Sequence, residues 1–211
     1  MRIITLATGN KYRACLAELL EGLGKFNTRA SVVCLSDALI PGYETILVPP
    51  ECIGYQSRRI KTQLDKYAGD GLNLFLDSDI QVLNSLDGIW DEIRDFDLAM
   101  MNEAALGYDP VTQCAAKSTP EEFDLMRTAW LRGSPYFNSG IILWRHSEST
   151  VKLFHTWHKE WLRFQEIDQP AFYRAMREVK PRIRQLHHKF HATPATHRRP
   201  DTVLSHRWIG Q

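Results

Sequence analysis

The sequence has no long apolar run and no excess of charge of either sign. No apolar stretch approaches the roughly 20 residues that a membrane-spanning helix needs, and the short run after Met1 does not resemble a secretory signal peptide. The formal net charge of +1 at pH 7 disfavours binding to nucleic acid or to a membrane surface through overall charge. These absences predict a cytoplasmic protein that binds no nucleic acid and has no membrane span, with at most a peripheral membrane contact.

Cysteine is scarce, and its spacing excludes one common kind of metal site. The four cysteines, Cys15, Cys34, Cys52 and Cys114, include no Cys-x-x-Cys pair, which disfavours a zinc ribbon. Cys15 and Cys34 lie in apolar segments and are expected to be small core residues in a reducing compartment. Repeats and low-complexity linkers are also absent, so the 211 residues predict a single domain with a full hydrophobic core.

The spacing of apolar residues predicts strands that alternate with helices in the first half of the chain. Such alternation is typical of an α/β protein with a mostly parallel sheet and helices on both faces. Residues 103–119 show no period and are predicted to form a loop, and the chain beyond the last helix shows little regular pattern apart from Val203-Leu204. The predicted strands span 3–7, 31–35, 45–48, 72–76, 97–101 and 137–144, and the predicted helices span 12–23, 60–68, 86–93, 120–130 and 151–164, with a last helix from 169.

Two carboxylates follow one of these strands. Asp77-Ser78-Asp79 comes directly after the apolar run 72–76, and the alternation of a strand puts both aspartates on one side, where they can share a cation. Carboxylate oxygens suit hard ions such as Mg²⁺ and Mn²⁺. Ligands of parallel sheets bind beyond the carboxyl ends of the strands, and Thr8-Gly9-Asn10 occupies a similar position after the first strand. An isolated Asp-x-Asp is nevertheless more often a solvated turn.

Five further landmarks occur in a fixed order, each weak alone but specific together. The sequence resembles the GT-A glycosyltransferases, in particular glycosyltransferase family 8, which includes glycogenin and the bacterial lipooligosaccharide galactosyltransferases. The resemblance spans nearly the whole chain. Besides the Asp-x-Asp, it is carried by Leu6-Ala7-Thr8-Gly9-Asn10-Lys11-Tyr12, Lys61-x-x-Leu64-x-x-Tyr67, Tyr136-Phe137-Asn138-Ser139-Gly140-Ile141, Asp168-Gln169-Pro170 and Leu204-Ser205-His206.

The resemblance implies a GT-A fold and a metal-dependent glycosyltransferase. A hexose or deoxyhexose would pass from a UDP-sugar, or another nucleoside-diphosphate sugar, to a glycan or glycoprotein acceptor with retention of anomeric configuration. Mn²⁺ or Mg²⁺ would be held by Asp77, Asp79 and His206. Motif by motif, the implied donor contacts are Ala7, Thr8, Asn10, Tyr12, Lys61, Asp77, Ser78 and Ser139, and the implied catalytic residues are Asp168, Gln169 and Asn138.

Several of these residues have simpler explanations. Lys61 alone is more often a lysine on a helix surface. Asn138-Ser139-Gly140 fits a strand bulge, although glycine also permits the close backbone approach that a sugar pocket needs. Asp168 fits a cap of the helix that begins at Gln169. The histidines near the end of the chain match no zinc spacing, so we expect His206 to join the two aspartates rather than a separate zinc site.

The chain departs from the family at its end, and other functions remain open. Arg207 and residues 208–211 stand where the family has a Gly-x-x-Lys-Pro-Trp segment whose lysine contacts the diphosphate. We expect either that Arg207 replaces this lysine or that the chain is the N-terminal domain of a longer protein. The alternatives are an inverting GT-A enzyme with Glu103 or Asp168 as its base, a non-catalytic sugar-nucleotide or glycan-binding module, and a nucleotidyltransferase. The last is disfavoured because the first loop has a single glycine.

Overall fold

A seven-stranded sheet forms the centre of the protein. The computed structural model describes residues 1–26, 29–50, 56–106, 109–115, 118–130, 135–196 and 198–207. The sheet has the order β3-β2-β1-β4-β7-β6-β8, and β5 and β9 form a second, two-stranded sheet. In chain order the strands are β1 (Arg2–Ala7), β2 (Ser31–Ser36), β3 (Glu44–Leu47), β4 (Leu72–Asp77), β5 (Ile80–Val82), β6 (Leu98–Asn102), β7 (Phe137–Arg145), β8 (Ile183–Gln185) and β9 (Leu204–His206).

The large sheet is mostly parallel, as expected. β1 pairs in parallel with β2 and β4, β2 with β3, and β6 with β8, whereas β7 is antiparallel to both β4 and β6. The amino end of β7 therefore lies at the edge of the sheet where its neighbours have their carboxyl ends. This arrangement brings the start of β7 to the edge at which ligands of α/β sheets bind.

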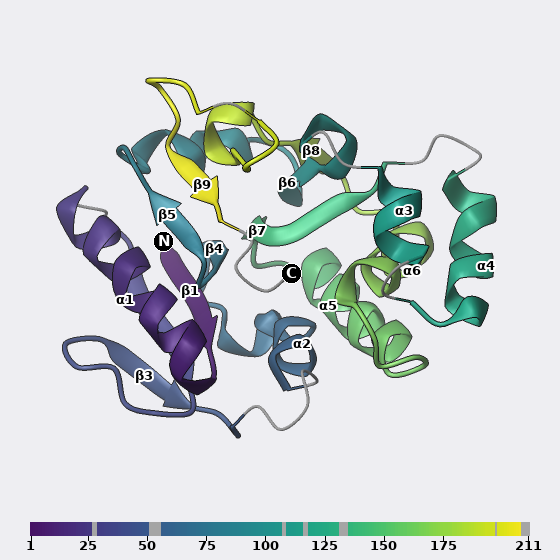
Figure 1. Cartoon of the computed structure of the whole chain (residues 1–211), viewed down its shortest axis with the longest axis horizontal. Helices are drawn as coiled ribbons and strands as arrows, with labels where there is room; N and C mark the ends of the chain where they lie inside the picture. Colours follow the sequence, from purple (N-terminus) through teal and green to yellow (C-terminus); the bar gives the residue numbers. More distant parts are fainter. Residues whose placement is uncertain are drawn as a thin grey trace.

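Helices cover both faces of this sheet. Figure 1 shows α1 on one side of the sheet and α5 and α6 on the other. None of the helices in the described segments is long and apolar enough to cross a membrane. The α-helices are α1 (Gly9–Lys25), α2 (Gln56–Lys61), α3 (Pro110–Ala115), α4 (Pro120–Trp130), α5 (Glu148–Trp161) and α6 (Asp168–Val179), and the 3₁₀ turns are η1 (Leu64–Tyr67), η2 (Asp87–Glu92), η3 (Glu103–Leu106) and η4 (His188–Phe190).

Neighbouring strand residues enter two separate cores. Ile3 and Leu74 are fully buried in the core that α1 covers, and Ile4 and Phe75 are fully buried in the core that α5 and α6 cover. Because successive strand side chains point to opposite faces, a strand covered on both faces needs a continuous apolar run. This explains why the strands were recognisable in the sequence, and the six predicted strands agree with β1–β4, β6 and β7 to within one residue.

The predicted loop at 103–119 is wrong for its described part, which contains η3 and α3. Asp109 accepts hydrogen bonds from the backbone N–H groups of Val111 (3.2 Å) and Thr112 (3.2 Å) and so caps α3, with Pro110 as its first residue. Asp-Pro is a helix-start signal, but a helix of six residues is too short to show an apolar period.

Two other expectations also need correction. The predicted helix 60–68 is divided into α2 and η1, since the N–H of Gln63 bonds the carbonyl of Ile60 in a tighter turn. The C-terminal segment contains β8, η4 and β9 rather than little regular structure, and β5 was not predicted. These strands have three residues each and form by pairing with distant segments, so the local sequence shows no apolar period that would predict them.

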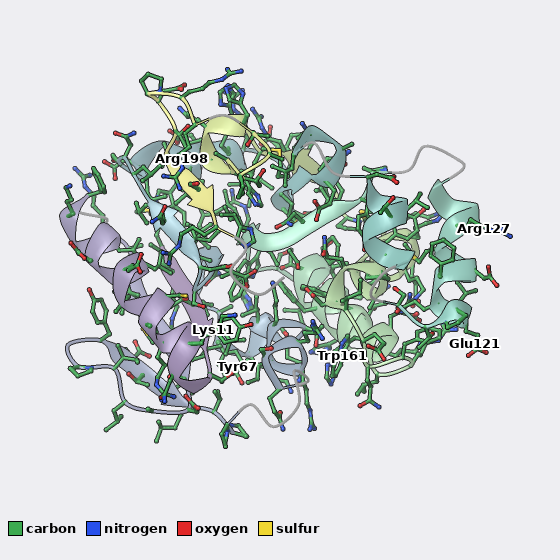
Figure 2. The ribbon with its side chains drawn as sticks, in the orientation of Figure 1. Lys11, Tyr67, Glu121, Arg127, Trp161 and Arg198 are labelled. Atoms are coloured by element: carbon green, nitrogen blue, oxygen red, sulfur yellow. The ribbon has the colours of Figure 1, made fainter. Side chains whose placement is uncertain are left out.

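The α3–α4 segment supports one wall of the site described below. On α4, Glu121 and Arg127 point outward (Figure 2), whereas Glu122 is buried and forms an ion pair of 2.8 Å with Arg174 of α6. Buried residues of α3 and α4 also form a small core with residues from the loop before β7, the loop before α6 and α6 itself: Cys114, Met126, Tyr136, Ile167 and Tyr173. Tyr136 and Ile167 line the cavity directly.

The expected burial of Cys15 and Cys34 is confirmed. Cys15 and Cys34 are buried core residues, and Cys114 is also buried. All three are free thiols, and Cys52 lies outside the described residues. Burial raises the pKa of Cys34 to about 11, which makes its thiol unreactive at neutral pH.

Candidate active site

A cavity of about 300 Å³ lies at the carboxyl ends of β1 and β4, bordered by the amino end of β7 and the first turn of α6. Ala7 and Asn10 are not in its lining. Ala7 is buried in the core under α1, and Asn10 is exposed and bonds the side chain of Arg13. The cavity brings together the other predicted site residues: Thr8, Tyr12, Lys61, Asp77, Ser78, Asp79, Asn138, Ser139, Asp168, Gln169 and His206.

Asp77, Asp79 and His206 converge at one end of this cavity, with ligand atoms that all lie within 4.8 Å of one another. Asp77 ends β4, and Asp79 lies in the turn to β5. β9 pairs with β5 so that His206 is opposite Ile80, and His206 Nε2 then lies 3.1 Å from Asp79 Oδ1. The pairing of two short strands thus brings a residue from the end of the chain to the Asp-x-Asp.

Gly140 gives the imidazole of His206 its space. A Cβ atom on Gly140 would lie 2.5 Å from Cε1 and 2.9 Å from Nδ1 of His206, and real Cβ atoms do not approach other atoms so closely. The pairing of β6 and β7 is irregular between Ala99 and Met101, opposite this part of β7. The irregular pairing is consistent with the expected strand bulge, and the close neighbour of Gly140 is the His206 ring, while an approach by a sugar stays a prediction.

These three side chains fit a divalent cation. Two carboxylates and one imidazole suit Mn²⁺ or Mg²⁺, which bind further oxygen ligands from water or phosphate. Within the described part of the chain, no second group of three such side chains lies close enough to form another site. The rings of His187 and His188 contact each other at the surface in a tilted arrangement, with centroids 4.0 Å apart, and His197 lies outside the described residues. Among the described residues, the other C-terminal histidines belong to no such group of three.

Lys61 is not a surface lysine, because it is buried beside the aspartates. Its Nζ lies 2.9 Å and 3.0 Å from the two carboxylate oxygens of Asp77 and 3.8 Å from Asp168 Oδ2. Burial alone would lower the pKa of Lys61, but the charges of Asp77 and Asp168 together raise it. The ammonium group is thus charged and links Asp77 to Asp168.

Asp77 sits among charges of both signs. Burial raises the pKa of its carboxyl group, Asp79 raises it further, and Lys61 opposes both effects. Two carboxylates are therefore held close together with one buried ammonium group. A bound cation would relieve their repulsion.

Asp168 does not cap α6, and its carboxylate faces the cavity instead. Ile167 is the N-cap of α6 and makes no side-chain cap, while Asp168 Oδ2 accepts a hydrogen bond of 2.6 Å from Ser139 Oγ. The backbone carbonyl of Asp168 accepts a hydrogen bond of 2.8 Å from Trp157 Nε1. Its position is thus held both through the side chain and through the backbone.

Glu103 organises two amides that line the cavity. Its Oε1 accepts hydrogen bonds from Asn138 Nδ2 (2.8 Å) and Gln169 Nε2 (2.6 Å). Gln169 Nε2 also donates to the carbonyl of Phe137 (3.2 Å), so the amide oxygen remains as the polar atom that Gln169 can present to a ligand. The sequence suggested Glu103 only as a base, because nothing local relates it to Asn138 or Gln169.

Other residues that line the cavity were not predicted as site residues. Ser57 and Arg58 of α2, Leu6 of β1, Tyr136 and Ile167 line the cavity. Leu6 and Tyr136 belong to the quoted motifs but were not singled out, and Ser57, Arg58 and Ile167 could have been suggested only by their places near recognised motifs.

Arg207 does not line the cavity, and its guanidinium pairs with Glu18 of α1. The expectation that Arg207 replaces the diphosphate-binding lysine is not supported by this geometry. Residues 208–211 lie outside the described residues.

Solved structures of glycosyltransferases share this fold. The galactosyltransferase LgtC, in complex with donor and acceptor sugar analogs, superposes with a TM-score of 0.68 and 16% identity over 98% of this chain and 86% of that one. Mouse xyloside xylosyltransferase 1 in its apo form gives 0.65 and 12% over 99% and 97% of the two chains. The glycosyltransferase GlyE of Streptococcus pneumoniae TIGR4 gives 0.57 and 16% over 90% and 46%.

Sequence comparison identifies the family directly. No curated protein matches the sequence significantly, but the family model of the nucleotide-diphospho-sugar transferases matches residues 72–200. That segment contains the Asp-x-Asp, β7 and the start of α6 and covers more than half of the chain. The chain therefore belongs to the nucleotide-diphospho-sugar transferase family and has the GT-A fold of its glycosyltransferases.

Proposed function

We propose that this chain is a metal-dependent, retaining glycosyltransferase. It moves a hexose or deoxyhexose from a UDP-sugar, or another nucleoside-diphosphate sugar, to a glycan or glycoconjugate acceptor. The observation that carries the proposal is the convergence of Asp77, Asp79 and His206 in one cavity with the Lys61–Asp168 pair. A metal site and a buried cation beside a sugar-sized cavity suit the departure of a nucleoside diphosphate.

The aspartate and histidine end of the cavity receives the diphosphate in this proposal. Asp77, Asp79 and His206 would hold Mn²⁺ or Mg²⁺, which supplies Lewis-acid stabilisation of the leaving diphosphate when bound. Lys61 contacts both oxygens of Asp77 and so fixes the direction of that carboxylate. Its charge also lowers the electrostatic cost of two neighbouring aspartates.

The nucleoside lies at the end of β1 in this proposal. Thr8 and Tyr12 line the cavity, and the Tyr12 side chain is partly exposed, which suits stacking on a base. Asn10 is exposed and bonded to Arg13, and Ala7 is buried in the core. We therefore restrict the proposed side-chain contacts of the nucleoside to Thr8 and Tyr12.

The sugar lies between β7 and α6, and the surroundings of the acids there favour retention. An inverting enzyme needs a carboxylate within hydrogen-bond reach of the acceptor hydroxyl. Asp168 accepts from Ser139 and lies near Lys61, and Glu103 accepts from two amides. Both acids accept hydrogen bonds from neighbouring side chains and are therefore better suited to hold those groups than to take a proton from an acceptor. Gln169 presents its amide oxygen to the sugar.

The proposed setting is cytoplasmic, with at most a peripheral membrane contact for the acceptor. Cys15, Cys34 and Cys114 are free thiols, which is consistent with a reducing compartment.

A donor screen tests the proposed function. The chain is mixed with a panel of UDP-, GDP- and dTDP-sugars with and without Mn²⁺, and thermal unfolding and release of the nucleoside diphosphate are measured. A donor that binds the folded state raises its stability, and we expect one UDP-sugar to do so only with the metal. If no nucleotide sugar shifts unfolding or is hydrolysed in either condition, the proposal is wrong. Equal binding with and without metal contradicts the metal dependence alone.

A further inference from the structure

A second histidine lies directly behind the histidine of the proposed metal site. His191 follows η4 and is 1% exposed, and its Nε2 lies 3.3 Å from Nδ1 of His206. The other ring nitrogen of His206, Nε2, lies 3.1 Å from Asp79 Oδ1. The two nitrogens of His206 therefore face different partners, one toward the aspartates and one toward His191.

The backbone holds this histidine pair in place. The N–H of Ala192 bonds the carbonyl of Leu204 (2.9 Å), and the N–H of His206 bonds the carbonyl of Ala192 (2.7 Å). The chain next to His191 thus lies alongside β9. On another side, the His206 ring lies so close to Gly140 that a side chain at position 140 would overlap it. The pair is consequently part of the fold rather than a chance contact between mobile side chains.

Hydrogen-bond chemistry then determines which tautomer of His206 is favoured. A histidine that binds a cation through Nε2 must keep the lone pair on that atom, so its single proton lies on Nδ1. That N–H needs an acceptor, and a buried neutral imidazole offers one at the nitrogen that carries no proton. The Nε2 of His191 lies where this acceptor is required.

We propose that His191 is a positioning residue that accepts the Nδ1–H of His206 and so directs the Nε2 lone pair of His206 toward the cation. The proposal rests on the metal site of the proposed function. Metal-ligating histidines commonly donate their second ring N–H to a neighbouring group, and loss of that partner typically weakens metal affinity by about 10–100-fold. His191 would be an uncommon partner, because carboxylates and backbone carbonyls usually have this role.

Direct measurement of Mn²⁺ affinity tests the proposal without relying on turnover. Free Mn²⁺ is titrated by electron paramagnetic resonance in the wild-type chain, in His191→Leu and in His191→Gln. The leucine removes the acceptor but keeps an apolar filling, whereas the glutamine amide oxygen can accept from His206. We expect His191→Leu to bind Mn²⁺ about 10–100-fold more weakly and His191→Gln to recover most of the affinity.

His158→Leu is the matched control. His158 is partly buried on α5 and contacts Thr62 Oγ1 through Nδ1 at 2.8 Å, away from the three proposed ligands. Its replacement should leave Mn²⁺ affinity unchanged. Thermal unfolding of every variant without metal shows whether each one folds.

The possible results separate this proposal from the proposed function. If the wild type binds Mn²⁺ and His191→Leu binds it equally well, the role of His191 is overturned and the metal site stands. Equal weakening in His191→Leu and His191→Gln also overturns it, because packing alone would then explain the loss. If the wild type binds no divalent cation, the proposed metal site and the proposed role of His191 are both wrong.

A second measurement covers the case in which His191→Leu does not fold. Ring nitrogen NMR of the metal-free and Mg²⁺-loaded wild type reports where the proton of His206 resides. We expect it on Nδ1 once Mg²⁺ is bound, whereas in the metal-free protein Nε2–H is placed to donate to Asp79 Oδ1, 3.1 Å away. A proton on Nε2 in the metal-free protein and no change on loading would overturn the proposal.

Discussion

The two ends of the cavity are built in different ways. At one end, which we call the metal end after its proposed ligand, Asp77 and Asp79 lie close together, and Lys61 offsets part of their charge. At the other end, between β7 and α6, which we call the sugar end after its proposed ligand, Glu103 holds the amides of Asn138 and Gln169 by hydrogen bonds. A bound cation would therefore balance charge at the metal end, whereas side chains at the sugar end are held by contacts within the protein. Substitutions should separate these two behaviours.

Asp79→Asn should have the largest effect, because it removes a charge and a ligand atom from the metal end. Loss of several kcal/mol of metal-derived stabilisation corresponds to a decrease in turnover on the order of 10³-fold or more. Initial rates with Mn²⁺, and Mn²⁺ affinity, check this. Asp87→Asn, an exposed change on η2, is the control. Activity that survives both Asp79→Asn and EDTA contradicts the metal site.

Asp168→Asn should have the next largest effect and should act at the sugar end. If Asp168 positions the donor through Ser139, the loss of turnover should be partial, about 10²–10³-fold. Mn²⁺ affinity should change little, because Asp168 is not one of the three proposed ligands. Initial rates and Mn²⁺ titration of the same variant measure the two effects.

The stereochemistry of the product gives an independent test of the sugar end. NMR of the first-formed product should show the anomeric configuration of the donor. Inversion, together with complete loss of turnover in Asp168→Asn, would identify Asp168 as a base. That result would reverse our interpretation of the sugar end and leave the metal end intact.

Gly140→Ala should weaken the metal end from the side of β7. The new methyl group would overlap the ring of His206, so His206 must move away from Asp79. We expect Mn²⁺ affinity to fall by about 10–100-fold, as for loss of another contact that orients a ligand. Gly88→Ala is the matched control, because a Cβ there lies 3.6 Å from its nearest neighbour. Unchanged affinity in Gly140→Ala would mean that His206 is not a ligand.

The smallest expected effect concerns binding of the nucleoside and is measured with Tyr12→Ala and Asn10→Ala. Loss of a stacking ring costs about 1–3 kcal/mol, so Tyr12→Ala should weaken UDP binding by about 5- to 150-fold. Asn10→Ala should change it less than about twofold, since surface substitutions away from a site have small effects. Titration calorimetry with UDP and Mn²⁺ compares the two. An equal loss in both variants would restore Asn10 as a donor contact.

The accuracy of the sequence-based predictions follows from the range of the interactions involved. Strands such as β1 and β4 were predicted to within one residue because burial on both faces requires a continuous apolar run. The six residues of α3 were missed although Asp109-Pro110 marks its start, since so short a helix shows no period. β5, β8 and β9 have three residues each, and their existence depends on partners far away in the chain.

The residues of the site were predicted more completely than their contacts. Motif order suggested Asp168, Gln169 and Asn138, yet the carboxylate that joins two of them, Glu103, was considered only as a base. Its contacts with Asn138 and Gln169 span three separate segments of the chain. His191 likewise belonged to an unassigned group of histidines, and only its distance from His206 distinguishes it.

The sequence by itself determined where the chemical groups stand relative to their own strands and helices. Asp77 follows an apolar run, and the side chains of that run indicate that the strand before Asp77 is buried. The tertiary structure decided which groups meet: β9 pairs with β5 and brings His206 to Asp79, and Gly140 leaves space for its ring. Such contacts depend on packing and on the closure of long chain segments, and the local period of apolar residues carries no information about either.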